Sequence, residues 1–298
     1  MMGRKFILSC ESTVDLPYSH LEERNIPVIF YHYVINDVDY IDDMGRDSEA
    51  LPGFYRLLEE GHLPSTSLIN TETYKEFFRG LLKDGDLLHI AFTSGQSASV
   101  GNALTAAEEL KEEFPDRKIM VIDSLCSSSG YGLIVDNAAD LSDEGKDMQE
   151  VYDYVMANRN KVHHQFFSSD MTQFRRTGRV SGPTAAIATI LNICPIMRLD
   201  DRGRIIAYDK VRGKKKAVQM TVEETLKHAQ GAGSYDQRMY ICNSNCLDDA
   251  LMLKNALEEA FPAQKGKIEI HDIGTIIGSH AGKGTVAVFF MGDERAPE

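Results

Sequence analysis

The sequence has 298 residues, enough for two domains of ordinary size. Its net charge of −13 disfavours general nucleic-acid binding and adhesion to an anionic membrane. Apolar runs such as residues 285–291 are too short to span a bilayer, and the N-terminus lacks the apolar region of a signal peptide. We therefore expect a cytoplasmic protein with no nucleic-acid partner and no membrane insertion.

Strands and helices are predicted to alternate over the first 161 residues. We expect strands at 5–10, 26–35, 86–92 and 118–122, a short return strand at 38–40, and helices at 52–60, 71–83, 100–113, 129–141 and 148–160. Such alternation predicts a parallel sheet with helices on both faces. Small polar residues follow three of these strands, at 10–13, 93–95 and 123–124, and ligands bind at this edge of such sheets.

The pattern changes after residue 161. We expect strands at 163–168, 238–243, 267–273 and 285–291, a hairpin of 195–199 and 204–211 around 200–203, and helices at 171–177, 184–193, 215–230 and 247–261. The sequence thus predicts an α/β protein of two domains. Residues 1–161 would form an N-terminal α/β/α domain on a parallel sheet, and residues 162–298 a smaller α/β domain with a mixed sheet. No linker separates them, so we expect a ligand cleft between packed domains.

Hydroxyl side chains are concentrated where helices are expected to begin. Ser94, Ser97 and Ser99 follow the strand at 86–92, and Thr66 belongs to a second cluster, residues 65–67. One serine suffices to cap a helix, whereas free N–H groups with additional hydroxyls suit an anionic head group. His280, in a glycine-rich turn, is a further candidate donor to an oxyanion. The chemistry predicted is capture of a carboxylate or phosphate.

A serine hydrolase is the alternative. Residues 95–99 nearly match the nucleophile elbow G-x-S-x-G between a strand and a helix, which would make Ser97 the nucleophile and His280 the base. An acid such as Asp248 or Asp272 lies between them in sequence. However, Ser99 replaces the last glycine of the elbow, and no HGG-type oxyanion motif is present.

The cysteines and the basic residues bear on metal binding and on partners. Five widely spaced cysteines fit buried reduced thiols, and Cys242 and Cys246 lack a second ligand pair, so we expect no metal. Basic residues gather in two clusters of the second half. Those taken as candidates for docking an acidic partner are Arg179, Arg202, Arg204 and Lys215.

Seven segments in order resemble the DegV family of bacterial fatty-acid-binding proteins. Residues 7–17 are similar to its opening with D-S-x-x-D-L, 64–67 to P-x-T-S, 94–99 to its serine loop, 123–124 to D-S, 174–181 to L-x-x-G-G-R-[IV]-S, 191–196 to L-x-I-K-P-[IL], and 277–284 to I-G-x-H-x-G-P-G. The resemblance runs nearly from end to end. It implies two α/β domains that bury one long-chain fatty acid between them, with no catalytic residues, metal or cofactor.

The resemblance also implies roles for particular residues. Thr66, Ser97 (or its neighbour Ser94) and His280 match the head-group positions. Some members present the bound acid to a separate fatty acid kinase, which makes a kinase a possible partner in phospholipid metabolism. The chain departs from the family at several positions: Gln96 replaces an apolar residue, Ala98 a glycine, Val100 an aromatic residue, Thr177 a glycine and Lys283 a proline. Gln96 and Val100 fall on the expected lining or entrance of the lipid site, and Thr177 falls near the expected docking face.

Overall fold

The computed structural model describes residues 4–181 and 192–297. The helix expected at 184–193 lies outside the described residues except for its last two, of which Ile193 begins a strand. The elements of the N-terminal half are β1 (Ile7–Glu11), α1 (Tyr18–Glu23), β2 (Val28–Ile29), β3 (His32–Ile35), β4 (Val38–Ile41), α2 (Ala50–Glu59), β5 (Ser65–Thr66), α3 (Thr71–Leu82), β6 (Leu87–Ala91), α4 (Ser99–Glu113), β7 (Ile119–Asp123), α5 (Ser128–Asp143) and α6 (Met148–Asn158).

The elements of the C-terminal half complete the described chain. They are β8 (Val162–Ser168), α7 (Thr172–Thr177), β9 (Val180–Ser181), β10 (Ile193–Leu199), β11 (Ile205–Arg212), α8 (Lys214–His228), β12 (Tyr240–Asn243), α9 (Leu247–Ala260), β13 (Glu269–Asp272), α10 (Thr275–Ala281) and β14 (Thr285–Met291). The α/β class predicted from the sequence is confirmed. The division near residue 161 stays a prediction.

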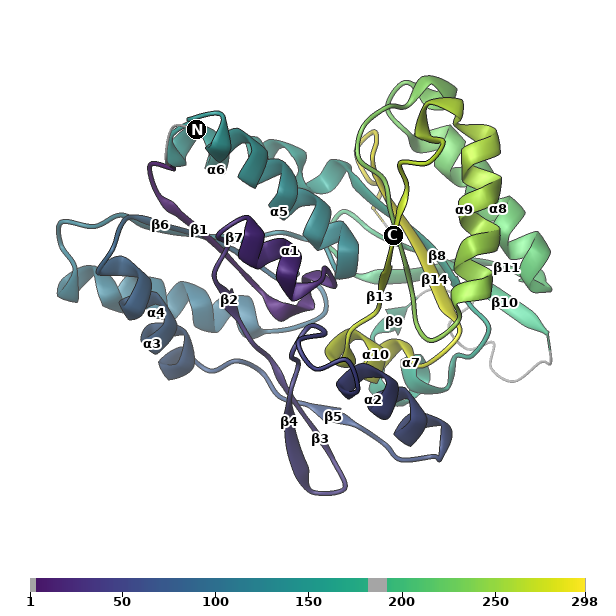
Figure 1. Cartoon of the computed structure of the whole chain (residues 1–298), viewed down its shortest axis with the longest axis horizontal. Coiled ribbons are helices and arrows are strands. Elements are labelled where there is room, and N and C mark those ends of the chain that lie inside the picture. The colour runs from purple at the N-terminus through teal and green to yellow at the C-terminus, as the bar shows by residue number, and fades with distance from the viewer. Residues whose placement is uncertain (1–3, 182–191, 298) are drawn as a thin grey trace.

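The first sheet is parallel, with strand order β2-β1-β6-β7. Helices α3 and α4 cover one face and α5 and α6 the other (Figure 1). Every residue of β6 is buried, as expected for a strand covered on both faces. Two of the helices have clear start signals: the Asn70 side chain accepts from the N–H of Thr73 at 2.9 Å, and Asp147 and Glu150 form a capping box.

The single strand predicted at 26–35 is wrong, because the chain breaks at residues 30–31 into β2 and β3. Strand β2 joins the parallel sheet, whereas β3 pairs with β4 and β5 in a separate three-stranded antiparallel sheet. Asn36 and Asp37 both have positive φ, 53° and 61°, as a two-residue hairpin turn of type I′ requires. Both strands are apolar, so their local pattern reads as one continuous run.

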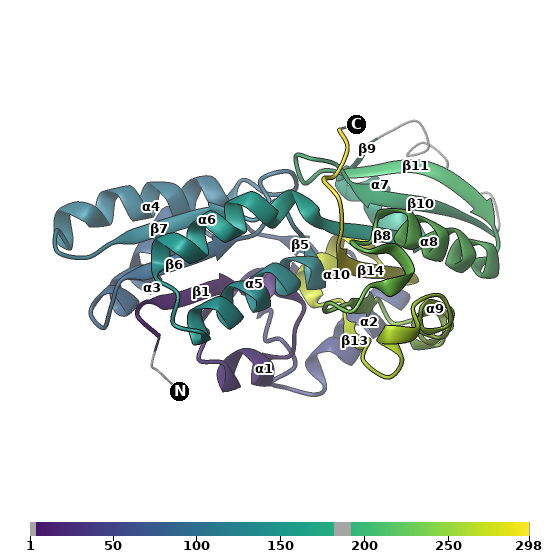
Figure 2. The same cartoon turned by 90° about the horizontal axis from the view of Figure 1, so that it is seen from above.

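The second sheet is mixed and has the order β13-β12-β14-β8-β10-β11-β9. Helices α8 and α9 pack on one face (Figure 1), and the N-terminal part of the molecule lies beside the other, as the view from above shows (Figure 2). Helix α5 contacts β8, β12 and β14, so the same helix that covers the parallel sheet also reaches the mixed one. No helix in the described part of the chain is long and apolar enough to cross a membrane.

Candidate functional site

A cavity of about 330 Å³ lies where the elements of the two sheets meet. Its inner wall is largely apolar, and this wall includes Phe92, Phe166, Phe174, Leu199, Ile276 and Phe289. These residues are all buried and come from both halves of the chain. The volume falls within the range of small-molecule pockets, which are mostly apolar with a few convergent polar groups.

The mouth of the cavity carries polar and exposed residues. Ser67, Leu68 and Ala98 line it and are exposed, and the exposed Arg179 lies on the same lining. Thr66, Ser97 and His280 also line the cavity and are half-buried. A ligand with one charged end and a long apolar body could therefore place its charge near solvent and its body among the aromatic residues.

Thr66 and His280 are in direct contact, although 214 residues separate them. The Thr66 hydroxyl lies 2.9 Å from His280 Nε2. The local structure predicted for both is wrong: Thr66 is in β5 rather than at a helix start, and His280 is in the last turn of α10 rather than in a turn. The pairing of β5 with β3 places Thr66, and Gly282, with a φ of 68°, ends the helix that carries His280.

The imidazole of His280 is neutral at pH 7. Burial, together with the positive charges of Arg179 and Arg176, lowers its pKa to about 4. Nδ1 is buried without a hydrogen-bond partner among the described residues. When Nε2–H donates to Thr66, the threonine hydroxyl keeps its own proton for an anion in the cavity. The pair can then act as one donor that His280 orients.

The two serine candidates lie in different places. Ser97 lines the cavity, and its hydroxyl donates to Ser99 Oγ at 3.1 Å while accepting the Ser99 N–H at 3.3 Å. Ser94 is exposed and lies outside the cavity lining, and its N–H donates to Asp123 Oδ1 at 3.1 Å. Of the two, Ser97 is therefore positioned to meet a ligand.

Ser97 and His280, the pair that the hydrolase alternative requires, do not make the contacts of a catalytic triad. A triad requires the nucleophile bonded to the base and the base bonded to an acid. Instead, the Ser97 hydroxyl donates to Ser99, His280 Nε2 faces Thr66, and His280 Nδ1 has no partner. Asp272, one acid considered, accepts from Asn243 at 3.2 Å. This geometry favours binding over hydrolysis.

The loop that carries Ser97 packs against the tip of the β10–β11 hairpin. The amide of Gln96 donates to the Gly203 carbonyl at 3.1 Å, and the Thr93 hydroxyl donates to the same oxygen at 3.3 Å. A Cβ on Gly95 would lie 2.5 Å from the backbone oxygens of Arg202 and Gly203, so only glycine permits this approach. Gln96 thus lines the cavity and joins the two halves of the chain.

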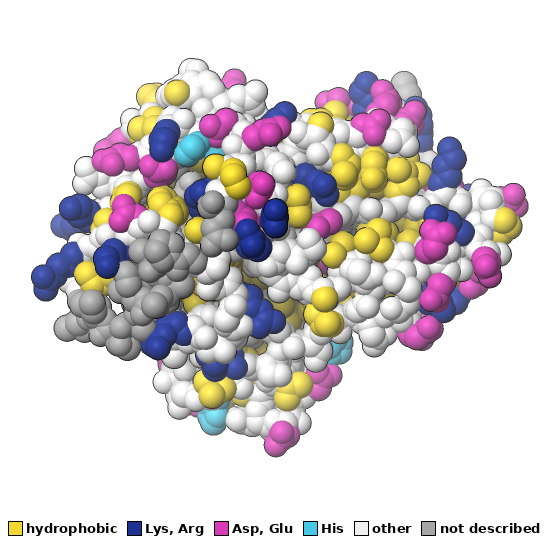
Figure 3. Space-filling model, turned by 180° about the vertical axis from the view of Figure 1, so that it is seen from behind, with side chains coloured by type: hydrophobic (Ala, Val, Ile, Leu, Met, Phe, Trp, Pro, Cys, Tyr) yellow, Lys and Arg dark blue, Asp and Glu magenta, His cyan; other side chains and the backbone are white. Residues whose placement is uncertain are grey.

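The four docking candidates have different environments. Arg179 is at the cavity mouth and donates to the Thr177 carbonyl, whereas Arg202 and Lys215 are exposed on the hairpin tip and the first turn of α8. Arg204 pairs with Asp200 at 2.7 Å and so braces the hairpin. Lys and Arg side chains gather at the centre and one side of the face in Figure 3. A docking role for them stays a prediction.

Sequence reasoning missed Thr13 and Tyr31 as lining residues. The Thr13 hydroxyl is buried without a partner, and the Tyr31 hydroxyl donates to Glu11 at 3.1 Å. Buried Glu11 also accepts from Tyr74 at 2.5 Å and from the Phe92 N–H at 3.0 Å. The polar end of the first strand was a signal for Thr13, because it marked that edge of the sheet. No local sequence pattern connected Tyr31 with this edge of the sheet.

Comparison with known proteins gives a consistent result. Residues 5–293 match the family model described as "Uncharacterised protein, DegV family". The chain is 36% identical over 296 residues to a DegV domain-containing protein of Clostridium perfringens, which covers 99% of this chain and 100% of the relative. It is also 29% identical to such a protein of Lactococcus lactis, over 95% of this chain and 96% of the relative.

Solved structures have the same fold. A fatty acid binding DegV family protein from Streptococcus agalactiae has a TM-score of 0.82 at 25% identity, covering 98% of this chain and 100% of that one. The Streptococcus pneumoniae fatty acid kinase (Fak) B3 protein, loaded with linoleic acid, has a TM-score of 0.80 at 23% identity. It covers 96% of this chain, and 99% of that protein is matched.

Proposed function

The chain belongs to the DegV family, and from this premise we propose that it binds one long-chain fatty acid in the cavity described above. The observation that carries the proposal is the Thr66–His280 pair, which lies with Ser97 at the mouth of a largely apolar cavity. The fatty acids bound by proteins of the same fold from Streptococcus agalactiae and Streptococcus pneumoniae support it.

The acyl chain supplies most of the affinity in this proposal. Each CH₂ transferred from water to an apolar wall contributes about 0.8 kcal/mol, so a chain of about sixteen carbons contributes roughly 10 kcal/mol before the costs of binding. Aromatic side chains such as Phe166 and Phe289 provide that wall. Length preference is then set by the buried part of the lining, which includes Thr13, Ser127 and Cys242.

The carboxylate is held at the mouth. An ionised carboxylate is costly to bury unless it is paired and hydrogen-bonded. Thr66 supplies a hydroxyl donor, and Ser97 supplies a second when its hydroxyl turns from Ser99 to the ligand. Arg179 adds a positive charge at the same end of the cavity. The protein itself performs no bond-breaking step in this proposal; it is a carrier in the cytoplasm.

A separate fatty acid kinase is the proposed partner. A kinase that transfers a phosphoryl group to the carboxylate must reach it from solvent, and the exposed residues Ser67, Ala98 and Arg179 surround that end of the cavity. Exposed Arg202 and Lys215 would attract an acidic partner surface.

Native mass spectrometry tests the proposal directly. Protein purified from a bacterial host should carry one long-chain fatty acid, recovered by organic extraction at close to one per chain. Ala98→Trp, which places a bulky side chain at the exposed mouth, should abolish that occupancy. Leu104→Trp, on the exposed face of α4, which begins directly after Ala98, is the control and should retain it.

The proposal fails if neither the purified protein nor delipidated protein offered palmitate and oleate holds a stoichiometric acid. It also fails if a fluorophosphonate labels Ser97 and ester turnover depends on that serine, because those results belong to a hydrolase.

A further inference from the structure

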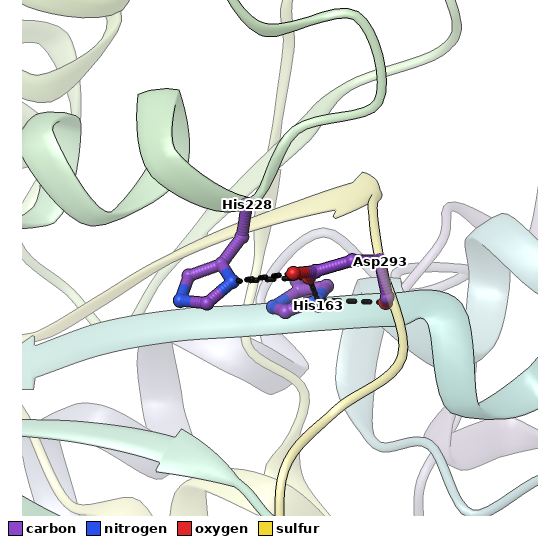
Figure 4. A group of neighbouring side chains, drawn as sticks. All are labelled: His163, His228 and Asp293. Atoms are coloured by element: carbon purple, nitrogen blue, oxygen red, sulfur yellow. Dashed lines mark hydrogen bonds and ion pairs between the residues drawn. The ribbon is translucent and has the colours of Figure 1, made fainter.

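Two histidines and a carboxylate that are not part of the cavity lining converge on one another (Figure 4). His163 is in β8, His228 ends α8, and Asp293 follows β14. His163 Nε2 lies 2.9 Å from Asp293 Oδ1, and His228 Nδ1 lies 3.0 Å from the same oxygen. One carboxylate oxygen therefore faces a nitrogen of each imidazole.

The three side chains combine a buried wall with an open side. His163 is 6% exposed and its ring is stacked between His228, at 4.9 Å between centroids, and Phe290, at 5.2 Å. Asp293 is 60% exposed, which leaves the group accessible from solvent. Packing thus fixes the ring of His163. On the opposite side, beside Asp293, there is room for an ion to enter and for water to complete its coordination.

We propose that His163, His228 and Asp293 form a binding site for a divalent transition-metal ion of the zinc class. The two nitrogens and a carboxylate oxygen all lie within 4.8 Å of one another. Bonds of about 2.0–2.1 Å in a tetrahedral site separate ligand atoms by about 3.3 Å, so the contacts of 2.9 and 3.0 Å must open. The half-exposed side of the site also lets the His228 ring turn out of its 20° stack on His163, so that both lone pairs meet the ion, and His163 Nε2 then leaves the Asp293 carbonyl oxygen, which lies 3.0 Å away. Water fills the fourth position.

The donor set selects the class of ion. Two imidazoles with one carboxylate suit Zn²⁺, Ni²⁺ or Cu²⁺, whereas Mg²⁺ and Ca²⁺ prefer sites made wholly of oxygen. Glu224 Oε2 lies 3.6 Å from His228 Nε2, the nitrogen that faces away from Asp293. A carboxylate on that side orients the ring and leaves the lone pair of Nδ1 for the ion.

The surrounding contacts show what an ion would hold in place. Residues 292–295 form a C-terminal strap: Asp293 N–H donates to the His228 carbonyl at 3.1 Å, and Arg295 N–H donates to the Asn160 carbonyl at 2.9 Å. The Arg295 guanidinium also donates to the Leu125 carbonyl at 2.8 Å. An ion would bind the strap to both β8 and α8. The positive charge of buried Arg295 opposes the binding of a cation. We therefore expect a micromolar Kd for the ion rather than a lower one.

The site is independent of the fatty-acid proposal, because none of its three residues lines the cavity. The test is isothermal titration of chelator-treated full-length protein with ZnCl₂. The wild type should bind one ion more per chain than His228→Ala, and zinc should raise its melting temperature more than that of the variant. His62→Ala is the matched control, since His62 lies beside a single carboxylate, Glu60, at 3.8 Å.

A second variant separates ligation from hydrogen bonding. Asp293→Asn retains an oxygen acceptor but loses the carboxylate, and it should weaken zinc binding at least tenfold. Co²⁺ should give the visible absorption bands of a tetrahedral nitrogen–oxygen site in the wild type and lose them in both variants. If stoichiometry and Co²⁺ spectrum are the same in the wild type, His228→Ala and Asp293→Asn, the cluster is only a hydrogen-bonded clamp on the strap and the proposal is wrong.

Discussion

Replacing Thr66 with valine tests whether the Thr66–His280 pair binds the carboxylate. Valine keeps the shape of the side chain but removes the hydroxyl that lies 2.9 Å from His280 Nε2. Ligand binding loses one charge-assisted hydrogen bond, worth about 1.5–3 kcal/mol, so the Kd for palmitate should rise roughly 10- to 150-fold. The unliganded fold loses only a neutral hydrogen bond, about 1 kcal/mol.

Calorimetric titration of delipidated protein with palmitate measures the affinity, and thermal unfolding measures the stability. Thr105→Val, at an exposed position of α4 outside the cavity lining, controls for loss of a threonine hydroxyl and should bind as the wild type does.

A double-mutant cycle with His280→Gln tests the arrangement further. If His280 acts by orienting the Thr66 hydroxyl, the double variant should lose less affinity than the sum of the single variants. Unchanged palmitate affinity in Thr66→Val would refute the assignment of this pair to the head group.

Three other predictions follow from separate parts of the structure. Because burial holds the pKa of His280 at about 4, below its ordinary 6.5, its contribution to the free energy of unfolding is complete above pH 6.5 and lost toward pH 4. In ligand-free protein, this residue should lower the free energy of unfolding by up to about 3 kcal/mol as the pH falls from 6.5 to 4. His280→Gln should flatten that pH dependence. Gly95→Ala should lower the free energy of unfolding by about 1–3 kcal/mol in denaturant titrations, because its Cβ would meet the hairpin backbone. Gly101→Ala is the control: this helical position has open space for a Cβ, so the change should raise the free energy of unfolding by up to about 1 kcal/mol. Charge reversal of Arg202 and Lys215 should leave palmitate affinity unchanged but slow phosphorylation by a fatty acid kinase at low salt; a wild-type rate there would mean that these residues form only a solvated surface.

The alternation of apolar segments with polar turns was enough to predict an α/β protein. Most helices were predicted within a few residues, because an amphipathic stripe and a cap such as Asn70 are local signals. The composition of the serine loop predicted an anion site at one end of the sheet; Ser97 does line the cavity, and its binding of an anion stays a prediction.

Local sequence patterns gave wrong predictions where two neighbouring apolar segments belong to different sheets. The apolar run at 26–35 contains β2 and β3, and only the competition among partner strands decides where it breaks. Thr66 was assigned to the start of a helix because hydroxyls are good caps, but its pairing with β3 makes it part of a strand. Pairing energy between distant strands leaves no periodic signal in either segment.

The fold class, the hydroxyl-rich loops and the apolar segments follow from local patterns of residues. Which of these side chains meet depends on tertiary packing. Thr66 and His280 are 214 residues apart, and His163, His228 and Asp293 share no spacing that identifies ligands. Their contacts depend on the order and register of the strands and on how the helices pack across them. Order, register and packing are fixed by burial and hydrogen bonding between distant segments, so they are properties of the whole chain.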